Sequence, residues 1–155
     1  MDKTTVCLSR IRTGDIEELP ITLTKTKHAA KRFSNEGVKA LNAAFNTSDK
    51  EYDKEAKVLC RDIRILLEQI VEVDLLKGIV RRYSPEVQTK GKIEHLAKIT
   101  PEDCKFVDEM MTAYSRYEHS QPEEAPVELP KPDEIEGDLK RIVEFIERVQ
   151  GRCKT

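Results

Sequence analysis

The chain contains no tryptophan, and phenylalanine and tyrosine together supply only 5% of its 155 residues. With 36% charged and 38% hydrophobic residues, this composition favours a helical protein with a charged exterior over a β-sandwich. The length is that of one ordinary domain, which can bury a substantial core without a metal ion or disulfide bonds. We therefore predict a mainly α-helical protein with no second domain.

The sequence also lacks an excess of one charge sign, a membrane-spanning run and a signal segment. Lys and Arg number 27 against 29 Asp and Glu, so the formal charge of −2 provides no overall field to attract a polyanion. Nucleic acid would have to bind at a local patch. No apolar run is long enough to cross a bilayer, and no charged-then-apolar segment opens the chain. We expect a cytoplasmic protein that does not bind membranes.

Closely spaced cysteines are absent as well. The four cysteines are widely separated, and none forms a Cys-x-x-Cys pair or has a histidine nearby at zinc-binding spacing. They are Cys7, Cys60, Cys104 and Cys153. This pattern argues against a metal site and a disulfide framework, so we expect free thiols, no metal and no cofactor.

Residues 1–26 form an N-terminal extension ahead of the predicted helices. Two stretches in it, Val6–Arg12 and Leu19–Thr24, have the residue types of β-strands and flank the turn-forming sequence Thr13–Asp15. They are compatible with a short β-hairpin. Because an isolated two-stranded hairpin is only marginally stable, it would need to pack on another part of the protein.

Residues 27–152 have the pattern of a helical bundle with about four main helices. Apolar periodicity, N-caps and prolines place the helices, a short helical piece and an extended proline-rich crossover. These segments are Lys27–Phe45, Lys50–Val80, Ile93–Ile99, a helix beginning at the cap Thr100-Pro101 and running to His119, the crossover Gln121–Pro132, and a last helix from Asp133. The helix Lys50–Val80 is the longest, and its centre is apolar enough to be buried on nearly all sides.

One line of polar side chains follows the long helix. At about 100° per residue, these side chains fall within roughly 80° of one another on an otherwise mostly apolar helix. They are Arg61, Arg64, Glu68 and Glu72. A simple interpretation is that Arg64 and Glu68 form an i,i+4 ion pair worth about 0.3–0.5 kcal/mol on an exposed face. The apolar surroundings favour a further role, because a desolvated charge line is costly to maintain.

A second polar line lies on the helix that begins near Pro101. Its members fall within about 60° on the helical wheel, and they are Asp108, Thr112, Ser115 and His119. Arg116 lies some 60° further round from His119. A lone histidine at a helix end is more often a C-terminal cap than a catalytic residue, but His119 has Ser115 one turn back and Arg116, Tyr117 and Glu118 beside it.

These groups suit RNA cleavage by attack of a 2′-hydroxyl on the adjacent phosphate. The reaction needs proton transfer, for which histidine is suited because its pKa lies near working pH. It also needs a permanent positive charge beside the phosphoryl oxygens, which arginine supplies. We therefore identify His119, Arg64, Glu68 and Arg116 as candidate catalytic residues. The candidate substrate-binding residues are Arg61, Tyr114 and Ser115.

An Arg-x-x-x-Glu on one long helix, followed by a helix ending in His, resembles the HEPN ribonuclease domain attached to ABC-type ATPases in bacterial anticodon nucleases. The resemblance gives Arg64, Glu68 and His119 the cleaving positions. The run Phe106–His119 is also similar to C-terminal regions of bacterial AAA/ABC-family ATPases. The resemblance implies a HEPN-like bundle over residues 27–152, a homodimer, an ATPase partner and RNA cleavage, with tRNA as one target, in a defence or toxin-type system.

The chain departs from the commonest HEPN motif, which places four to six residues between Arg and His. Arg116 and His119 have two residues between them, so Arg116 is a secondary candidate and Arg64 the main one. No Walker lysine loop is present, so an ATPase that controls this chain would lie on another segment or another protein.

Two other functions are compatible with the sequence. The chain could be a non-catalytic module that dimerises or docks onto an ABC/AAA ATPase, with Arg64, Glu68 and His119 only tying two helices together. Plain nucleic-acid binding is less favoured. A basic patch exists at Lys25, Lys27, Lys31 and Arg32, but no aromatic platform accompanies it.

Overall fold

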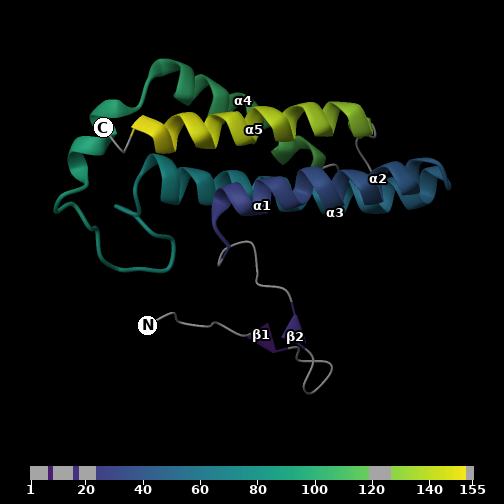
Figure 1. The fold of residues 1–155 in the computed structure, drawn as a ribbon, viewed down its shortest axis with the longest axis horizontal. Helices are drawn as coiled ribbons and strands as arrows, with labels where there is room; N and C mark the ends of the chain where they lie inside the picture. The colour runs from purple at the N-terminus through teal and green to yellow at the C-terminus, as the bar shows by residue number, and fades with distance from the viewer. Residues whose placement is uncertain (1–6, 9–15, 18–23, 119–126, 153–155) are drawn as a thin grey trace.

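The protein is a mainly helical bundle, as the sequence predicts (Figure 1). In this computed structural model, the residues described are 7–8, 16–17, 24–118 and 127–152. Helices α3 (Asp49–Ile70) and α5 (Pro132–Arg152) run along the length of the bundle, and α4 (Pro101–Glu118) packs against α3. In the described part of the chain, no helix combines the length and the apolar character needed to cross a membrane.

The first predicted helix, Lys27–Phe45, is one continuous helical run with a π-helical turn in its middle. It consists of α1 (Thr26–Arg32), η2 (Phe33–Gly37) and α2 (Val38–Phe45). A Cβ atom on Gly37 would lie 2.9 Å from Leu59 Cδ1, so glycine allows this run to approach α3 closely. Helical propensity alone indicates only that Gly37 weakens the helix. The structure gives it a packing role.

Helix α3 begins where the sequence predicts but ends earlier. Ser48 caps it, because the Ser48 hydroxyl accepts a hydrogen bond of 3.3 Å from the Glu51 N–H. The predicted end at Val80 is wrong, since the α-helix ends at Ile70 and the π-helical turn η3 covers Val71–Leu75. Lys77 and Gly78 then have φ angles of 52° and 64°, and this left-handed backbone cannot continue a right-handed helix.

The two remaining connections largely follow their sequence signals. The short helical piece is the 3₁₀-helix η4 (Ile93–Lys98), and α4 follows it at the predicted proline. Thr100 and Asp103 form a reciprocal capping box, with N–H···O distances of 2.9 Å and 3.3 Å. The predicted crossover is described from Val127 onward and leads into α5 at Pro132.

The N-terminal extension contains a very short hairpin. Strands β1 (Cys7–Leu8) and β2 (Ile16–Glu17) pair antiparallel, with Cys7 opposite Glu17 and Leu8 opposite Ile16. The first strand lies within the predicted Val6–Arg12. The predicted second strand, Leu19–Thr24, lies outside the described residues except for Thr24.

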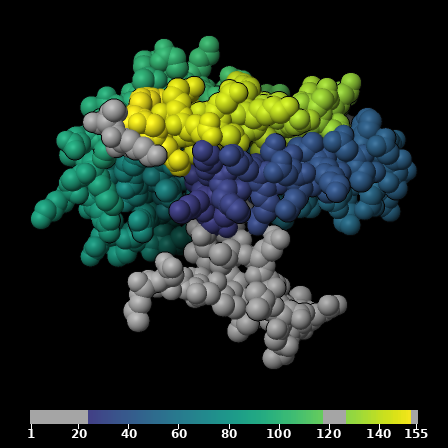
Figure 2. Space-filling model, in the orientation of Figure 1, coloured from purple at the N-terminus to yellow at the C-terminus, as the bar shows by residue number. Residues whose placement is uncertain are grey.

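The core is built from the facing stripes of α3, α4 and α5, with α1 and α2 closing one side. Figure 2 shows α5 lying directly against α1 and α2 on the face in view. The largest fully buried side chains from the three long helices are Ile63, Leu66, Leu67, Ile70, Met110, Tyr114, Ile135, Leu139, Ile142, Phe145 and Ile146. Their spacing of three and four residues places each set on one side of its helix.

Two of the predicted free thiols lie among the described side chains. Cys60 and Cys104 form no disulfide. Burial raises the pKa of the Cys60 thiol to about 12, so this sulfur is unreactive at neutral pH. The predictions for Cys7 and Cys153 fall outside the described side chains.

Candidate functional site

The two predicted polar lines meet between α3 and α4. Arg64 Nε on α3 donates a hydrogen bond of 3.1 Å to Ser115 Oγ on α4, although the two residues are 51 positions apart. The Arg64 side chain is 26% exposed, so its guanidinium group is partly withdrawn from water but remains reachable. This contact brings two of the predicted site residues together.

Arg64 also forms an ion pair along its own helix. Its Nη1 atom lies 3.1 Å from Glu68 Oε1, the i,i+4 contact that helical spacing favours. The other carboxylate oxygen of Glu68 accepts a hydrogen bond from Arg82 Nη1. Arg82 Nε in turn lies 3.2 Å from Glu72 Oε2. A continuous row of side chains therefore runs from Ser115 through Arg64, Glu68 and Arg82 to Glu72. We call these five residues the arginine–carboxylate row.

An open hollow of about 310 Å³ lies beside one end of this row. Glu68, Glu72 and Arg82 form its charged border. The rest of its lining is apolar and consists of Val71, Leu76, Val80 and Met111. The cation in this lining, Arg82, is 43% exposed on its side chain and is paired with both carboxylates.

Three other candidates take no part in the row as the structure describes it. Arg61 is 55% exposed on its side chain and lies 3.3 Å from Asp62. Arg116 is exposed in the last turn of α4. His119 follows the end of α4 directly and lies outside the described residues.

Tyr114 requires a correction as a substrate-binding candidate. Its side chain is fully buried, and its hydroxyl donates a 3.1 Å hydrogen bond to Asp138 Oδ2. Burial and the nearby Asp138 carboxylate raise the pKa of Tyr114 well above its usual range, so it stays neutral. Tyr114 faces the core and Ser115 faces α3, because neighbouring residues on a helix point about 100° apart. Tyr114 therefore has no surface that a substrate could contact in this structure.

Arg82 is the residue of the row that sequence reasoning missed. The Arg81-Arg82 pair resembles a cationic helix end, and the sequence assigns it only to complementing the dipole of the long helix. The chain instead turns back at Lys77 and Gly78 and carries Arg82 to Glu68 and Glu72. The available sequence clue is Gly78 beside Lys77, which indicates a turn before the arginines.

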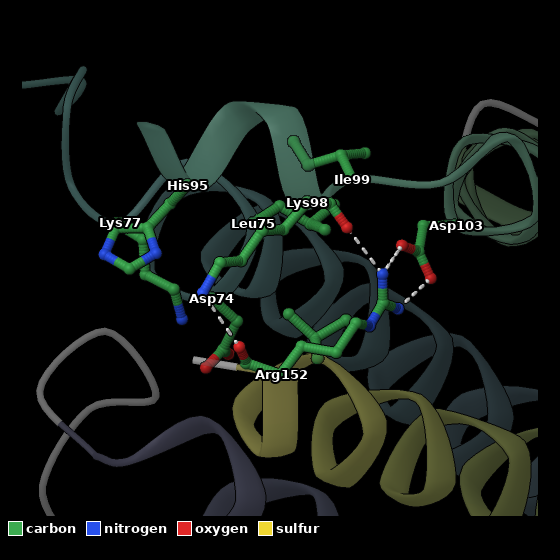
Figure 3. A pocket seen from close by; sticks show the side chains of 9 residues that line it. Asp74, Leu75, Lys77, His95, Lys98, Ile99, Asp103 and Arg152 are labelled. Atoms are coloured by element: carbon green, nitrogen blue, oxygen red, sulfur yellow. Dashed lines mark hydrogen bonds and ion pairs between the residues drawn. The ribbon is translucent and has the colours of Figure 1, made fainter. Parts of the chain in front are cut away.

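A second polar cluster joins α4 to the end of α5 (Figure 3). Asp103 is fully buried, and Arg152 holds both of its oxygens at 2.7 Å while also donating to the main-chain oxygen of Lys98. Arg148 lies 3.3 Å from the same carboxylate. Burial alone raises the pKa of Asp103, but hydrogen bonds from Arg152 and Thr100 outweigh burial and hold the pKa well below its usual range.

The cavity beside this cluster is too small to bind a substrate. Its volume is about 10 Å³, which is room for one water molecule. His95, Lys77 and Lys98 line it together with Asp74 and Asp103 (Figure 3). The cluster therefore fixes the relative position of α4 and α5, and the arginine–carboxylate row is the better functional candidate.

The fold and the row define a helical-bundle protein in which arginine and carboxylate side chains alternate across α3, η3 and the loop after it, with Ser115 of α4 at one end. No family model, curated protein or solved structure matches the chain. Among the described residues, no group of three or more His, Cys, Asp or Glu side chains could hold a metal ion.

Proposed function

We propose that the chain is a metal-independent endoribonuclease domain of a bacterial defence or toxin-type system, with tRNA as a candidate target. The observation that supports this proposal is the 3.1 Å hydrogen bond from Arg64 to Ser115, because it joins the helix that carries Glu68 to the helix that His119 follows. We further propose that the protein works in the cytoplasm as a homodimer under the control of an ABC/AAA ATPase on another segment or subunit.

In the proposed reaction, the 2′-hydroxyl oxygen attacks the adjacent phosphorus and the bond to the 5′-oxygen breaks. His119 transfers protons, since histidine can take up and release one near neutral pH. Arg64 stabilises the negative charge that develops on the phosphoryl oxygens, and Arg116 is the secondary cation for this role. Glu68 orients Arg64 through the 3.1 Å ion pair. The products are a 2′,3′-cyclic phosphate and a 5′-hydroxyl end.

The test is to incubate the purified protein in EDTA with total cellular RNA and with tRNA, alone and with any cognate ATPase. We expect cleavage that leaves 2′,3′-cyclic phosphate ends. His119→Ala and Arg64→Ala should each abolish it, as expected for residues that transfer the proton and stabilise the charge. Matched controls are His28→Ala and Arg141→Ala. His28 is exposed on α1. Arg141 is exposed on α5, where it pairs with Glu109 and Asp138 and lies over the Phe106 ring, away from the arginine–carboxylate row, so both controls should cleave like wild type.

A non-catalytic docking module is the second candidate, and the ion pairs of Glu68 favour it. Glu68 is bound by both Arg64 and Arg82, and Glu72 is bound by Arg82, as a purely structural ladder requires. The docking function predicts that neither Arg64→Ala nor His119→Ala changes any RNA, and that both weaken assembly with the ATPase. RNA left whole by the wild type in every combination would contradict the nuclease, and weakened assembly of both variants would support docking.

A further inference from the structure

The loop between η3 and η4 differs in charge from the rest of the chain. Residues 76–92 contain five Lys and Arg side chains against the single carboxylate Glu86, a net charge of +4 in a chain whose total is −2. In the described part of the protein, Arg81 and Lys90 have no ion-pair partner. Both are exposed, so their charges are available to a polyanion.

The same loop exposes large apolar side chains. Tyr83 is 95% exposed, the highest value among the exposed large hydrophobic residues of the described chain. Val80 and Val87 are 51% and 64% exposed. Tyr83 follows Arg81 and Arg82 in sequence, and its ring is almost fully exposed. Proteins bind unpaired bases and their flanking phosphates with exposed aromatic rings and arginines of this kind.

The loop is held in place beside the candidate site. Arg82 ties it to Glu68 and Glu72, and Val80 and Arg82 both line the 310 Å³ hollow. Main-chain hydrogen bonds from Gln88 N–H to Ile79 O (2.8 Å) and from Ser84 N–H to Arg81 O (3.0 Å) fix its path. The exposed ring of Tyr83 is therefore next in sequence to a residue of the arginine–carboxylate row.

We infer that this loop binds single-stranded RNA, with Tyr83 stacking on an unpaired base and Arg81 and Lys90 contacting phosphates. The inference rests on the proposed function and names its substrate class. Bases in a duplex already stack on one another, so Tyr83 can stack only on bases of a loop, bulge or single strand. The basic patch on α1 contains Lys25 and Lys31 but no exposed aromatic ring, and we expect it to contribute little.

The experiment measures binding without cleavage, in the His119→Ala background. Fluorescence anisotropy is recorded with a labelled oligouridylate and with an RNA duplex of equal length. We expect the single strand to bind more tightly than the duplex. Tyr83→Ala should weaken single-strand binding by about 5- to 150-fold, and Tyr83→Phe should not.

A salt series tests the cations. The double variant Arg81→Gln/Lys90→Gln should reduce the slope of log K against log salt by about 1.4, because each single-strand phosphate contact contributes about 0.7. Lys25→Gln/Lys31→Gln removes the same charge from α1 and should leave the slope unchanged. Circular dichroism checks that each variant remains folded.

Three outcomes overturn the inference. They are no RNA binding, RNA binding by Tyr83→Ala as tight as that of its parent, and an equal change in salt slope for Arg81→Gln/Lys90→Gln and Lys25→Gln/Lys31→Gln. Failure of the proposed function looks different. If the protein binds single-stranded RNA through Tyr83 but leaves all RNA whole, the nuclease proposal fails and the RNA-binding loop stands. If the protein cleaves RNA and Tyr83→Ala leaves kcat/KM unchanged, the nuclease proposal stands and the RNA-binding loop fails.

Discussion

Asp103 is fully buried, yet it remains charged because α5 brings two arginines to it. The sequence predicts its place in the first turn of α4 and its cap with Thr100. Arg152, which binds both carboxylate oxygens, lies 49 residues further along the chain. A single residue thus combines a local role, as a helix cap, with a long-range role, as the anchor for the end of α5.

Asp103→Ala should destabilise the fold by about 2–3 kcal/mol at neutral pH, because it removes hydrogen bonds to charged groups and leaves Arg152 unpaired. The folded-state pKa of Asp103 lies below its ordinary value of about 3.9, so its contribution is full above that pH and falls as the pH drops below it. Urea unfolding at several pH values measures this. The difference between wild type and variant should shrink in acid.

Glu109→Ala is the control for this measurement. Its ion pair with Arg141 is 52% and 45% exposed on the two side chains, so its loss should cost no more than about 1 kcal/mol. If Asp103→Ala is no more destabilising than Glu109→Ala, the buried cluster does not anchor α5.

The turn after η3 decides where the long helical run ends and where Arg82 lies. Lys77 and Gly78 are both left-handed, and a Cβ atom on Gly78 would lie 3.0 Å from Arg81 Nε. The apolar run through Val80 predicts more helix, but this backbone turns the chain back toward Glu68 and Glu72. The element boundary therefore contributes directly to the site.

Gly78→Ala should destabilise the protein by about 1–2 kcal/mol, because a left-handed backbone brings Cβ against the carbonyl oxygen. Under the proposed function it should also weaken RNA cleavage, since the turn positions Arg82 and Tyr83. The control is Gly137→Ala, at an exposed helical position of α5 with no atom near the added Cβ. That change should stabilise by up to about 1 kcal/mol. In thermal unfolding, Gly78→Ala should lower the midpoint and Gly137→Ala should raise it. Equal shifts of the midpoint would contradict the role of the turn.

At the scale of the whole molecule, one chain covers the long helix. The sequence predicts that the apolar centre of the long helix is buried on nearly all sides, and a second copy of the chain is one way to cover it. In the structure, its Ile63, Leu66, Leu67 and Ile70 are fully buried in one core cluster, whose other members include residues of α1, α2, α4 and α5 as well as of α3 itself. The homodimer stays a prediction, but the core does not require it.

Across about a hundredfold range of protein concentration, the protein should therefore keep a cooperative thermal unfolding transition even where it is monomeric, because its core is complete within one chain. A homodimer that forms from folded subunits would only raise the midpoint by mass action. Differential scanning calorimetry measures this midpoint, and sedimentation over the same range reports the dimer separately. Loss of the cooperative transition at concentrations where sedimentation shows a monomer would show that a second copy completes the fold.

The sequence by itself determines most of the helical architecture. Apolar residues recur at three- and four-residue spacing along each helix, Ser48 and Thr100 cap two of them, and Pro101 and Pro132 open α4 and α5. These signals are local, since each depends on residues within one or two helical turns. For the same reason the pairing of Arg64 with Glu68 can be read from the sequence.

Only the tertiary structure decides which polar groups meet. The hydrogen bond from Arg64 to Ser115 spans 51 residues and depends on how α3 and α4 pack. Arg82 joins the row because two left-handed residues reverse the chain, and Tyr114 leaves the candidate site because its side of α4 faces α5. Helical periodicity gives the direction of a side chain around its own helix. The packing of helices against one another decides which side chain of a neighbouring helix it meets.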